Sequence, residues 1–225
     1  MQTVLRQASK SSGILAIFAI VGTTLLAATY LATKDAIAET EKQAKLALIG
    51  QILPGDMYDN DLIQDVGELP AAAELGSKDA TPVYRASLGG QPSAAVIEAV
   101  APDGYSGKIK LLVAVRANGE LSGVRVLAHA ETPGLGDYIE IAKSPWIKVF
   151  DGLSLAKYQD KDWKVRKDGG KFEHNTGATV SPRAIVKAVH KALKYVEANR
   201  EKLFPAVKLA NEGASAQMSP KEQAK

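Results

Sequence analysis

The chain of 225 residues contains no cysteine. This absence excludes disulfides, thiolate-ligated iron–sulfur clusters, c-type haem attachment and cysteine-ligated zinc. Histidine is also scarce, and no two of His129, His174 and His190 have the short spacing that places two metal ligands on one helix face. Any redox chemistry in this chain therefore needs an organic cofactor, and no metal site is expected.

Clustered positive charge is missing as well. The 28 lysines and arginines and the 25 acidic residues are dispersed along the chain and leave a formal net charge of +3. A nucleic-acid-binding surface would concentrate its cations, so no nucleic-acid partner is expected. The length and the 46% of hydrophobic residues suffice for one well-packed domain plus an anchor.

A stretch without any charged side chain lies near the N-terminus, at residues 11–33. Its length fits a transmembrane helix, which needs about 20 mainly apolar residues. Arg6 and Lys10 precede it, so the positive-inside rule places residues 1–10 in the cytoplasm and the residues after the span in the periplasm. The alternative is a signal peptide cleaved near Ala36–Ala38, but the apolar stretch is longer than the usual 7–15 residues. We favour a retained single-pass anchor in a bacterial inner membrane.

Three regions are expected beyond the span. Residues 34–56 form a helical connector that stops at Pro54-Gly55, residues 57–205 form the folded domain, and the polar residues 206–225 form a disordered tail. The final helix of the domain should run from Ser181 to about Asn199, with Lys187, Lys191 and Lys194 on its solvent side. Its apolar face would consist of Ile185, Val186, Val189, Leu193 and Val196.

Four apolar, β-branched runs in the domain predict strands, at residues 83–88, 94–100, 109–115 and 124–128. Asn118-Gly119 between the last two runs is typical of a two-residue hairpin turn. The expected fold is α+β: an N-terminal transmembrane helix followed by one domain with a mostly antiparallel sheet flanked by helices.

The segment Thr176-Gly177-Ala178-Thr179 stands immediately ahead of the last helix. Ser181 suits the N-cap and Pro182 the first helical turn. The free N–H groups and the positive dipole end of the helix favour phosphate, and Gly177 and Ala178 keep the backbone slim enough for a bulky group to approach. From the residues alone, a Ser/Thr-rich cap without a ligand is the open alternative.

A second loop, Glu131-Thr132-Pro133-Gly134-Leu135-Gly136, follows the last predicted strand. Its two glycines and one proline fix a tight turn. The side chains of Glu131, Thr132 and Leu135 are in a position to face one wall of a ligand site.

These two motifs, together with Ala101-Pro-Asp-Gly-Tyr-Ser-Gly107 and the N-terminal anchor, resemble the family of the G subunit of the Rnf (Rsx) ion-translocating electron-transport complex. The resemblance extends from Ser11 to about Val196. Related FMN-binding domains occur in the C subunit of the sodium-translocating NADH:quinone reductase.

The resemblance implies a covalent FMN. The second threonine of the family motif, here Thr179, is esterified by the FMN phosphate, which a separate flavin transferase transfers from FAD. The family usually has an aspartate where this chain has Glu173. The remaining residues that the resemblance assigns to the cofactor site are Thr176, Gly177, Ala178, Ser181, Glu131, Thr132, Leu135 and Gly136.

The implied function is that of an electron carrier, not catalytic on its own, in a membrane complex that couples electron flow between ferredoxin and NAD to ion movement. Its partners would be the flavin and iron–sulfur subunits of the same complex. Direct NAD binding is not expected, because the chain lacks a dinucleotide fingerprint. The alternatives are the flavinylated subunit of a related quinone reductase and a cofactor-free membrane-anchored assembly or binding module.

Three aromatic side chains could stack on the isoalloxazine ring: Tyr105, Trp146 and Trp163. We favour a place in the core for both tryptophans, because aromatic residues of a small sheet domain are usually packed inside. His129 and Glu131 are not assigned a proton-transfer role.

Overall fold

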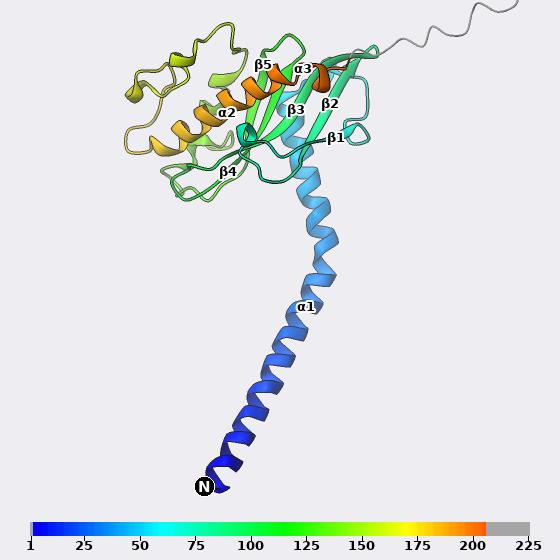
Figure 1. Cartoon of the computed structure of the whole chain (residues 1–225), viewed down its shortest axis with the longest axis vertical. Coiled ribbons are helices and arrows are strands. Elements are labelled where there is room, and N and C mark those ends of the chain that lie inside the picture. The colour runs from blue at the N-terminus through cyan, green and yellow to red at the C-terminus, as the bar shows by residue number, and fades with distance from the viewer. Residues whose placement is uncertain (1, 206–225) are drawn as a thin grey trace, which may run out of the picture. The chain divides into compact units, whose positions relative to one another are not determined.

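The computed structural model describes residues 2–205 (Figure 1), so the predicted disordered tail at 206–225 lies outside the described residues. The first element is the α-helix α1 (Gln2–Ile52), which contains the predicted span at residues 11–33 and ends before Pro54-Gly55, as expected. Its segment Arg6–Ile52 is long and apolar enough to cross a membrane. By its contacts the chain divides into two compact units, residues 1–47 and residues 48–225.

The second unit is built on a five-stranded antiparallel sheet whose strands follow one another in chain order. All four predicted strands are present, and a fifth was missed. The missed strand has four residues with only one buried side chain, so it carries no alternation that a pattern could reveal. The α+β prediction is confirmed. The strands are β1 (Val66–Leu69), β2 (Thr81–Leu88), β3 (Gln91–Ala101), β4 (Ile109–Arg116) and β5 (Leu121–Ala128).

The hairpin between β4 and β5 is confirmed, but the prediction of a two-residue turn is wrong. The Gly119 N–H donates to the Arg116 carbonyl at 2.8 Å, and the Arg116 N–H donates to the Glu120 carbonyl, also at 2.8 Å. Gly119 has a φ of +88°, a conformation that favours glycine. The turn is therefore longer than two residues. Gly119 takes the left-handed conformation, and Asn118 lies directly before it.

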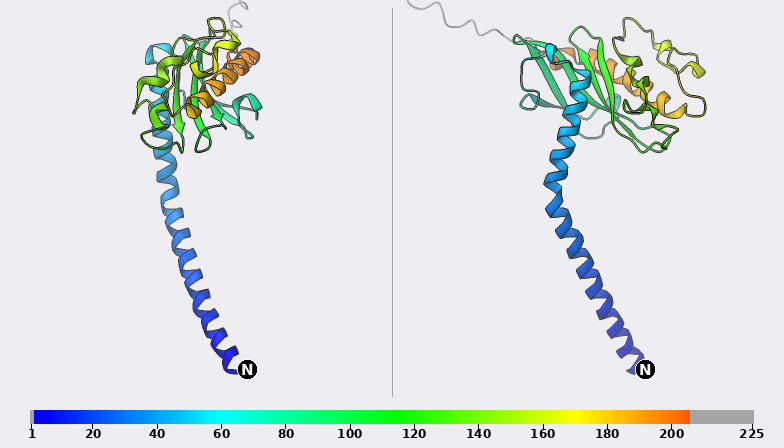
Figure 2. Two further views of the ribbon diagram at one scale, coloured as in Figure 1. Left: turned by 90° about the vertical axis from the view of Figure 1, so that its left-hand side faces the viewer. Right: turned by 180° about the vertical axis from the view of Figure 1, so that it is seen from behind.

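The helix α2 (Val180–Ala198) covers one face of the sheet and forms the main core (Figures 1 and 2). Because side chains alternate along a strand, one set from the central strands points toward this helix. The predicted apolar face of α2 is confirmed, with Lys187, Lys191 and Lys194 exposed on the other side. The buried apolar residues of the helix that were predicted are Ile185, Val186, Val189, Leu193 and Val196.

The last turn of α1 lies on the opposite face of the sheet, where Ile49, Ile52 and Leu53 are buried. Gly123 of β5 makes this approach possible, since a Cβ atom there would stand 2.7 Å from Ile52 Cγ2. The buried Arg125 holds the same turn by donating from Nε to Gln51 Oε1 at 3.0 Å. Burial lowers the pKa of Arg125, and the charge of Asp151 opposes that shift.

Short 3₁₀ helices fill the connection between β5 and α2. Aromatic rings pack along it and close one end of the core, with ring centroids 5.1 Å apart for Phe150 and Phe172 and 5.4 Å apart for Trp163 and Phe172. Trp163 is buried, as predicted, whereas Trp146 is only partly buried. The short helices of the described residues are η1 (Gly55–Met57), η2 (Ala73–Leu75), η3 (Asp137–Ile139), η4 (Pro145–Phe150), η5 (Asp160–Asp162), η6 (Arg166–Asp168) and α3 (Arg200–Leu203), of which η3 to η6 lie between β5 and α2.

Candidate cofactor site

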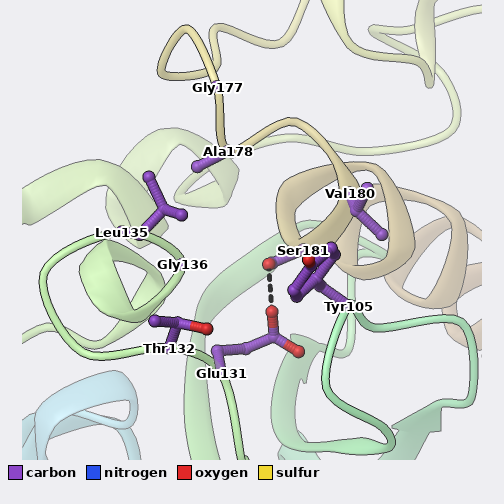
Figure 3. Close-up of a pocket in the computed structure, with 9 residues that line it drawn as sticks. All are labelled: Tyr105, Glu131, Thr132, Leu135, Gly136, Gly177, Ala178, Val180 and Ser181. Atoms are coloured by element: carbon purple, nitrogen blue, oxygen red, sulfur yellow. Dashed lines mark hydrogen bonds between the residues drawn. The ribbon is translucent and has the colours of Figure 1, made fainter.

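Two loops that are far apart in the sequence meet at one pocket of about 130 Å³ (Figure 3). One loop follows β5 and the other leads into α2. Seven of the nine predicted site residues line the pocket, and Tyr105 and Val180 join them. The lining consists of Tyr105, Glu131, Thr132, Leu135, Gly136, Gly177, Ala178, Val180 and Ser181.

Glu131 connects the two loops. Its carboxylate accepts a hydrogen bond from Ser181 Oγ of α2 on one oxygen and from the Ser106 N–H at 3.1 Å on the other. Only 4% of Glu131 is exposed, and its bond with Ser181 is buried, whereas the bond from the exposed Ser106 is partly buried. A buried carboxylate needs such donors, because an unpaired one would be costly to desolvate. The Glu131 carboxylate therefore links the two loops that border the pocket.

Gly136 leaves the space that the hydrogen bond between Glu131 and Ser181 needs. A Cβ atom at this position would stand 3.0 Å from Glu131 Oε2 and 3.1 Å from Ser181 Oγ. Gly104 plays a similar part beneath the carboxylate, where a Cβ atom would stand 2.8 Å from Glu131 Oε1. The backbone thus encloses the carboxylate on two sides where any other residue would displace it.

The loop after β5, residues 129–137, is stabilised by hydrogen bonds of its own side chains to its own backbone. His129 Nδ1 accepts from the Glu131 N–H at 2.9 Å, and Asp137 Oδ1 accepts from the Gly134 N–H at 2.8 Å. Because His129 Nδ1 is an acceptor, the ring proton is on Nε2, which lies 2.5 Å from Glu140 Oε1. His129 therefore links the Glu131 backbone to the Glu140 side chain in this structure.

Thr179 occupies the N-cap of α2, and Val180 is the first helical residue. The prediction that Ser181 is the N-cap is therefore wrong by two positions. The physical reason is that the Ser181 hydroxyl bonds to Glu131 rather than to the backbone of its own helix. Pro182 does lie in the first turn, as predicted. Thr179 is partly buried and, among the described residues, its side chain caps no backbone N–H of the helix.

The segment ahead of Thr179 makes a tight turn. The Ala178 N–H donates to the Asn175 carbonyl at 3.1 Å, and Gly177 has a φ of +87°. Thr176 and Gly177 are exposed, and a Cβ atom on Gly177 would meet nothing within 4 Å. Thr176 and Thr179 flank the pocket without lining it. Space for a bulky substituent thus exists beside the turn.

Ion pairs occupy the charged side chains nearest this helix end. Arg183 Nε and Nη2 donate to the two carboxylate oxygens of Asp168, at 2.5 and 2.9 Å, and hold the pKa of Asp168 below its usual range. Lys187 Nζ lies 2.6 Å from Asp103 Oδ2 and lowers the pKa of that carboxyl in the same way. The helix N-terminus at Thr179 has positive character of its own, separate from these two ion pairs.

The mouth of the pocket is apolar and open to solvent. Tyr105 is 70% exposed, Leu135 49% and Val180 37%, although all three are large apolar or aromatic residues. Exposed apolar groups that gather around a pocket are typical of a binding site. Tyr105 was identified from the sequence as a candidate for stacking, whereas Val180 was missed because a single valine ahead of the predicted helix carries no sign of ligand contact.

Two family models match the chain. The model described as FMN-binding domain matches residues 104–194, and the model described as RnfG N-terminal region matches residues 1–52. The first range contains both pocket loops, and the second coincides with α1.

Several bacterial proteins are similar over most of their length, and each is named as the G subunit of an ion-translocating oxidoreductase complex. The protein of Pseudomonas aeruginosa (strain UCBPP-PA14) is 50% identical over 199 residues, which cover 88% of this chain and 93% of the relative. That of Aliivibrio fischeri (strain ATCC 700601 / ES114) is 48% identical over 194 residues, 86% of this chain and 92% of the relative. That of Vibrio cholerae serotype O1 (strain M66-2) is 46% identical over 194 residues, with the same two shares.

Proposed function

Because the chain belongs to the family of G subunits of ion-translocating oxidoreductase complexes, FMN-binding components of the Rnf type, we propose that FMN is attached to Thr179 through a phosphoester bond. One observation carries the proposal: Thr179 is the N-cap of α2, directly beside the pocket, and its side chain caps no N–H of the described helix. Its hydroxyl is therefore not committed to the structural role that an N-cap threonine usually has.

The residues around Thr179 fit the phosphate end of the cofactor. The N–H groups of Val180 and Ser181 lie in the first turn of α2, where no carbonyl of the same helix precedes them. The third helical residue is Pro182, which has no N–H to leave unsatisfied. A phosphate on Thr179 would receive the donors and the positive dipole end of this helix.

The pocket residues fit the ring end. Gly177 and Gly136 leave the backbone bare, while Tyr105, Leu135 and Val180 offer apolar surface at the rim. FMN supplies one-electron and two-electron redox chemistry when it is bound. The chain's own contribution is to cover part of the ring, hold its orientation and exclude water from the side that faces the pocket.

The attachment requires a separate flavin transferase with FAD as the donor. Thr179 Oγ forms a bond to the phosphorus atom of the FMN half, the phosphoanhydride bond of FAD breaks, AMP leaves, and the hydroxyl proton is released. Thr179 is consumed once as an acceptor and does not turn over. A covalent link also prevents loss of the cofactor from a domain outside the cytoplasm.

The proposed role is transfer of electrons between flavin and iron–sulfur subunits of the same complex, coupled to ferredoxin, NAD and ion transport. The helix α1 would anchor the chain in the inner membrane, with residues 1–10 in the cytoplasm and the FMN-binding domain in the periplasm. The transferase and the other subunits are the expected partners.

The attachment is tested by co-expressing the full chain with a flavin transferase and reading flavin fluorescence on a denaturing gel. Thr179→Ala should abolish the fluorescent band, because no acceptor oxygen is left. Thr176→Ala is the matched control, since it removes the other threonine of the motif, and should keep the band. A fluorescent Thr179→Ala protein would refute attachment at this residue, and a dark wild type beside an active transferase would favour a cofactor-free module.

The topology is tested on the same chain, which offers a clean background because it has no cysteine. A single cysteine at the exposed Ala156 should react with a membrane-impermeant maleimide in spheroplasts. A single cysteine at the exposed Ser9 should react only after the membrane is opened. The reverse pattern would place the domain in the cytoplasm.

A further inference from the structure

The segment before Thr179 is held by one hydroxyl group. Tyr138 Oη accepts a hydrogen bond from the Asn175 N–H at 3.1 Å and donates one to the Ala178 carbonyl at 3.2 Å. These two backbone groups stand at the two ends of the turn that contains Thr176 and Gly177. A single oxygen atom thus closes the turn from the outside.

Tyr138 itself has little freedom. It lies in η3, directly after the loop that carries Glu131, and only 7% of it is exposed. Its ring packs edge-on against Trp146, with centroids 5.7 Å apart. Burial raises the pKa of the Tyr138 hydroxyl, so the group keeps the proton that it donates to Ala178.

Trp146 fastens the same segment one step earlier. Its Nε1–H donates to the Glu173 carbonyl at 2.8 Å. Two aromatic side chains in mutual contact therefore supply three hydrogen bonds to the backbone of residues 173–178. Within the segment the turn contributes one backbone bond of its own, from the Ala178 N–H to the Asn175 carbonyl.

From this geometry we propose that Tyr138 is the positioning residue for flavin attachment, with its hydroxyl fixing the turn that presents Thr179 to the transferase. The inference rests on the proposed attachment at Thr179. Tyr138 does not touch the reacting atoms, because its contacts are to the backbone of Asn175 and Ala178. It acts on the step in which Thr179 Oγ replaces AMP at phosphorus by keeping the acceptor segment in one conformation.

The expected size of the effect follows from the bonds that are lost. Tyr138→Phe keeps the ring and its packing against Trp146 and removes both hydrogen bonds of the hydroxyl. Each such bond is worth a factor of roughly five in an equilibrium. If the loosened turn is ordered again only on the transferase, kcat/KM for flavin transfer should fall about tenfold or more.

The test uses the full chain in detergent with purified transferase and FAD, and follows attachment by intact mass over a range of acceptor concentrations. Tyr138→Phe is compared with Tyr195→Phe, a matched control that removes the hydroxyl of an equally buried tyrosine near the far end of α2. Hydrogen exchange of the peptide that contains Asn175 is measured on both variants before any transferase is added.

We expect Tyr138→Phe to lower kcat/KM for transfer, to speed exchange in residues 173–178 and to keep the circular dichroism spectrum. Tyr195→Phe should match the wild type in transfer and in that exchange. An unchanged or faster rate for Tyr138→Phe, beside a reactive wild type, would overturn the inference and leave the proposed function intact. A wild type that accepts no flavin from an active transferase would overturn both.

Discussion

The two loops that border the pocket are stabilised in opposite ways. The loop after β5 is fastened from within, because His129 and Asp137 bond to backbone groups of their own loop. The segment that leads to Thr179 is fastened from outside, by Tyr138 and Trp146. The loop after β5 thus keeps its conformation through its own hydrogen bonds. The conformation of the segment before Thr179 depends instead on two side chains from outside that segment. Glu131 joins the two through Ser181.

The largest effect on this arrangement is expected from Glu131→Ala. The change leaves the buried Ser181 hydroxyl and the partly buried N–H of the exposed Ser106 without their acceptor. An unsatisfied buried donor costs about 1–3 kcal/mol and the lost bond to the exposed Ser106 about 1 kcal/mol, so the free energy of unfolding should fall by roughly 2–4 kcal/mol. Urea unfolding of the detergent-solubilised chain, followed by near-ultraviolet circular dichroism, measures it.

The matched control for Glu131→Ala is Glu201→Ala, which truncates an exposed glutamate in α3. Its unfolding should stay within about 0.5 kcal/mol of the wild type. Equal effects of the two substitutions would show that the buried Glu131 carboxylate does not stabilise the contact between the two loops.

A smaller loss is expected from Gly136→Ala, which adds a methyl group against the hydrogen bond between Glu131 and Ser181. The new Cβ would stand 3.0 Å from Glu131 Oε2 and 3.1 Å from Ser181 Oγ, so the two side chains must separate. Overpacking of this kind costs about 1–3 kcal/mol. Gly55→Ala is the control, because a Cβ there meets nothing within 4 Å. A thermal shift that is the same for both variants would speak against the close fit around Glu131.

Trp146→Phe tests whether the segment before Thr179 depends on side chains outside it while the loop after β5 does not. The substitution keeps an aromatic ring but removes the hydrogen bond from Nε1 to the Glu173 carbonyl. Global stability should fall by only about 1 kcal/mol, while hydrogen exchange in residues 173–178 increases. The peptide that contains Glu131 should exchange as in the wild type. Faster exchange in both loops would mean that they are one cooperative unit.

Much of this fold could be predicted from the pattern of the sequence, and the reasons are local. The helix α2 was placed to within one residue at its start, because Pro182 and the apolar spacing mark it. The contact between Glu131 and Ser181 could not be predicted, since fifty positions separate the two residues and either side chain would satisfy a turn or a cap equally well. The same physical reason explains why Ser181 was taken for the N-cap.

Tyr138 was missed for a related reason. A tyrosine inside a mixed segment carries no periodic signal, and its role depends on a backbone carbonyl forty positions away. The strand β1 was missed because its four residues show no alternation. Local rules thus identified the motifs, while the bonds that assemble them into one pocket required the structure.

The smallest effect is a dependence of stability on pH that arises outside the two loops, at His190. Burial lowers the pKa of His190 below 6.5, and the charge of Lys194 adds to the shift, whereas Asp160 opposes it; the ring stacks on Trp163. Since the folded state prefers the neutral ring, this stabilisation is complete above pH 6.5 and is lost as the pH falls through the folded pKa.

The urea midpoint should therefore decrease between about pH 7.5 and about pH 5.5 in the wild type. His190→Gln should show a weaker decrease, because the group that titrates is gone. At each pH, exchange of the two pocket loops should be the same in the wild type and in His190→Gln. An identical pH dependence of wild type and variant would exclude His190 as the source.

Attachment at Thr179 is measured most directly by the mass of the tryptic peptide 172–183, which contains Thr176, Thr179 and Ser181. The full chain is isolated from cells that also make an active flavin transferase, and the peptide is fragmented to assign any added mass to one hydroxyl. We predict the added mass of one FMN less one water, located on Thr179. An unmodified peptide, or the same mass on Thr176 or Ser181, would contradict attachment at this residue.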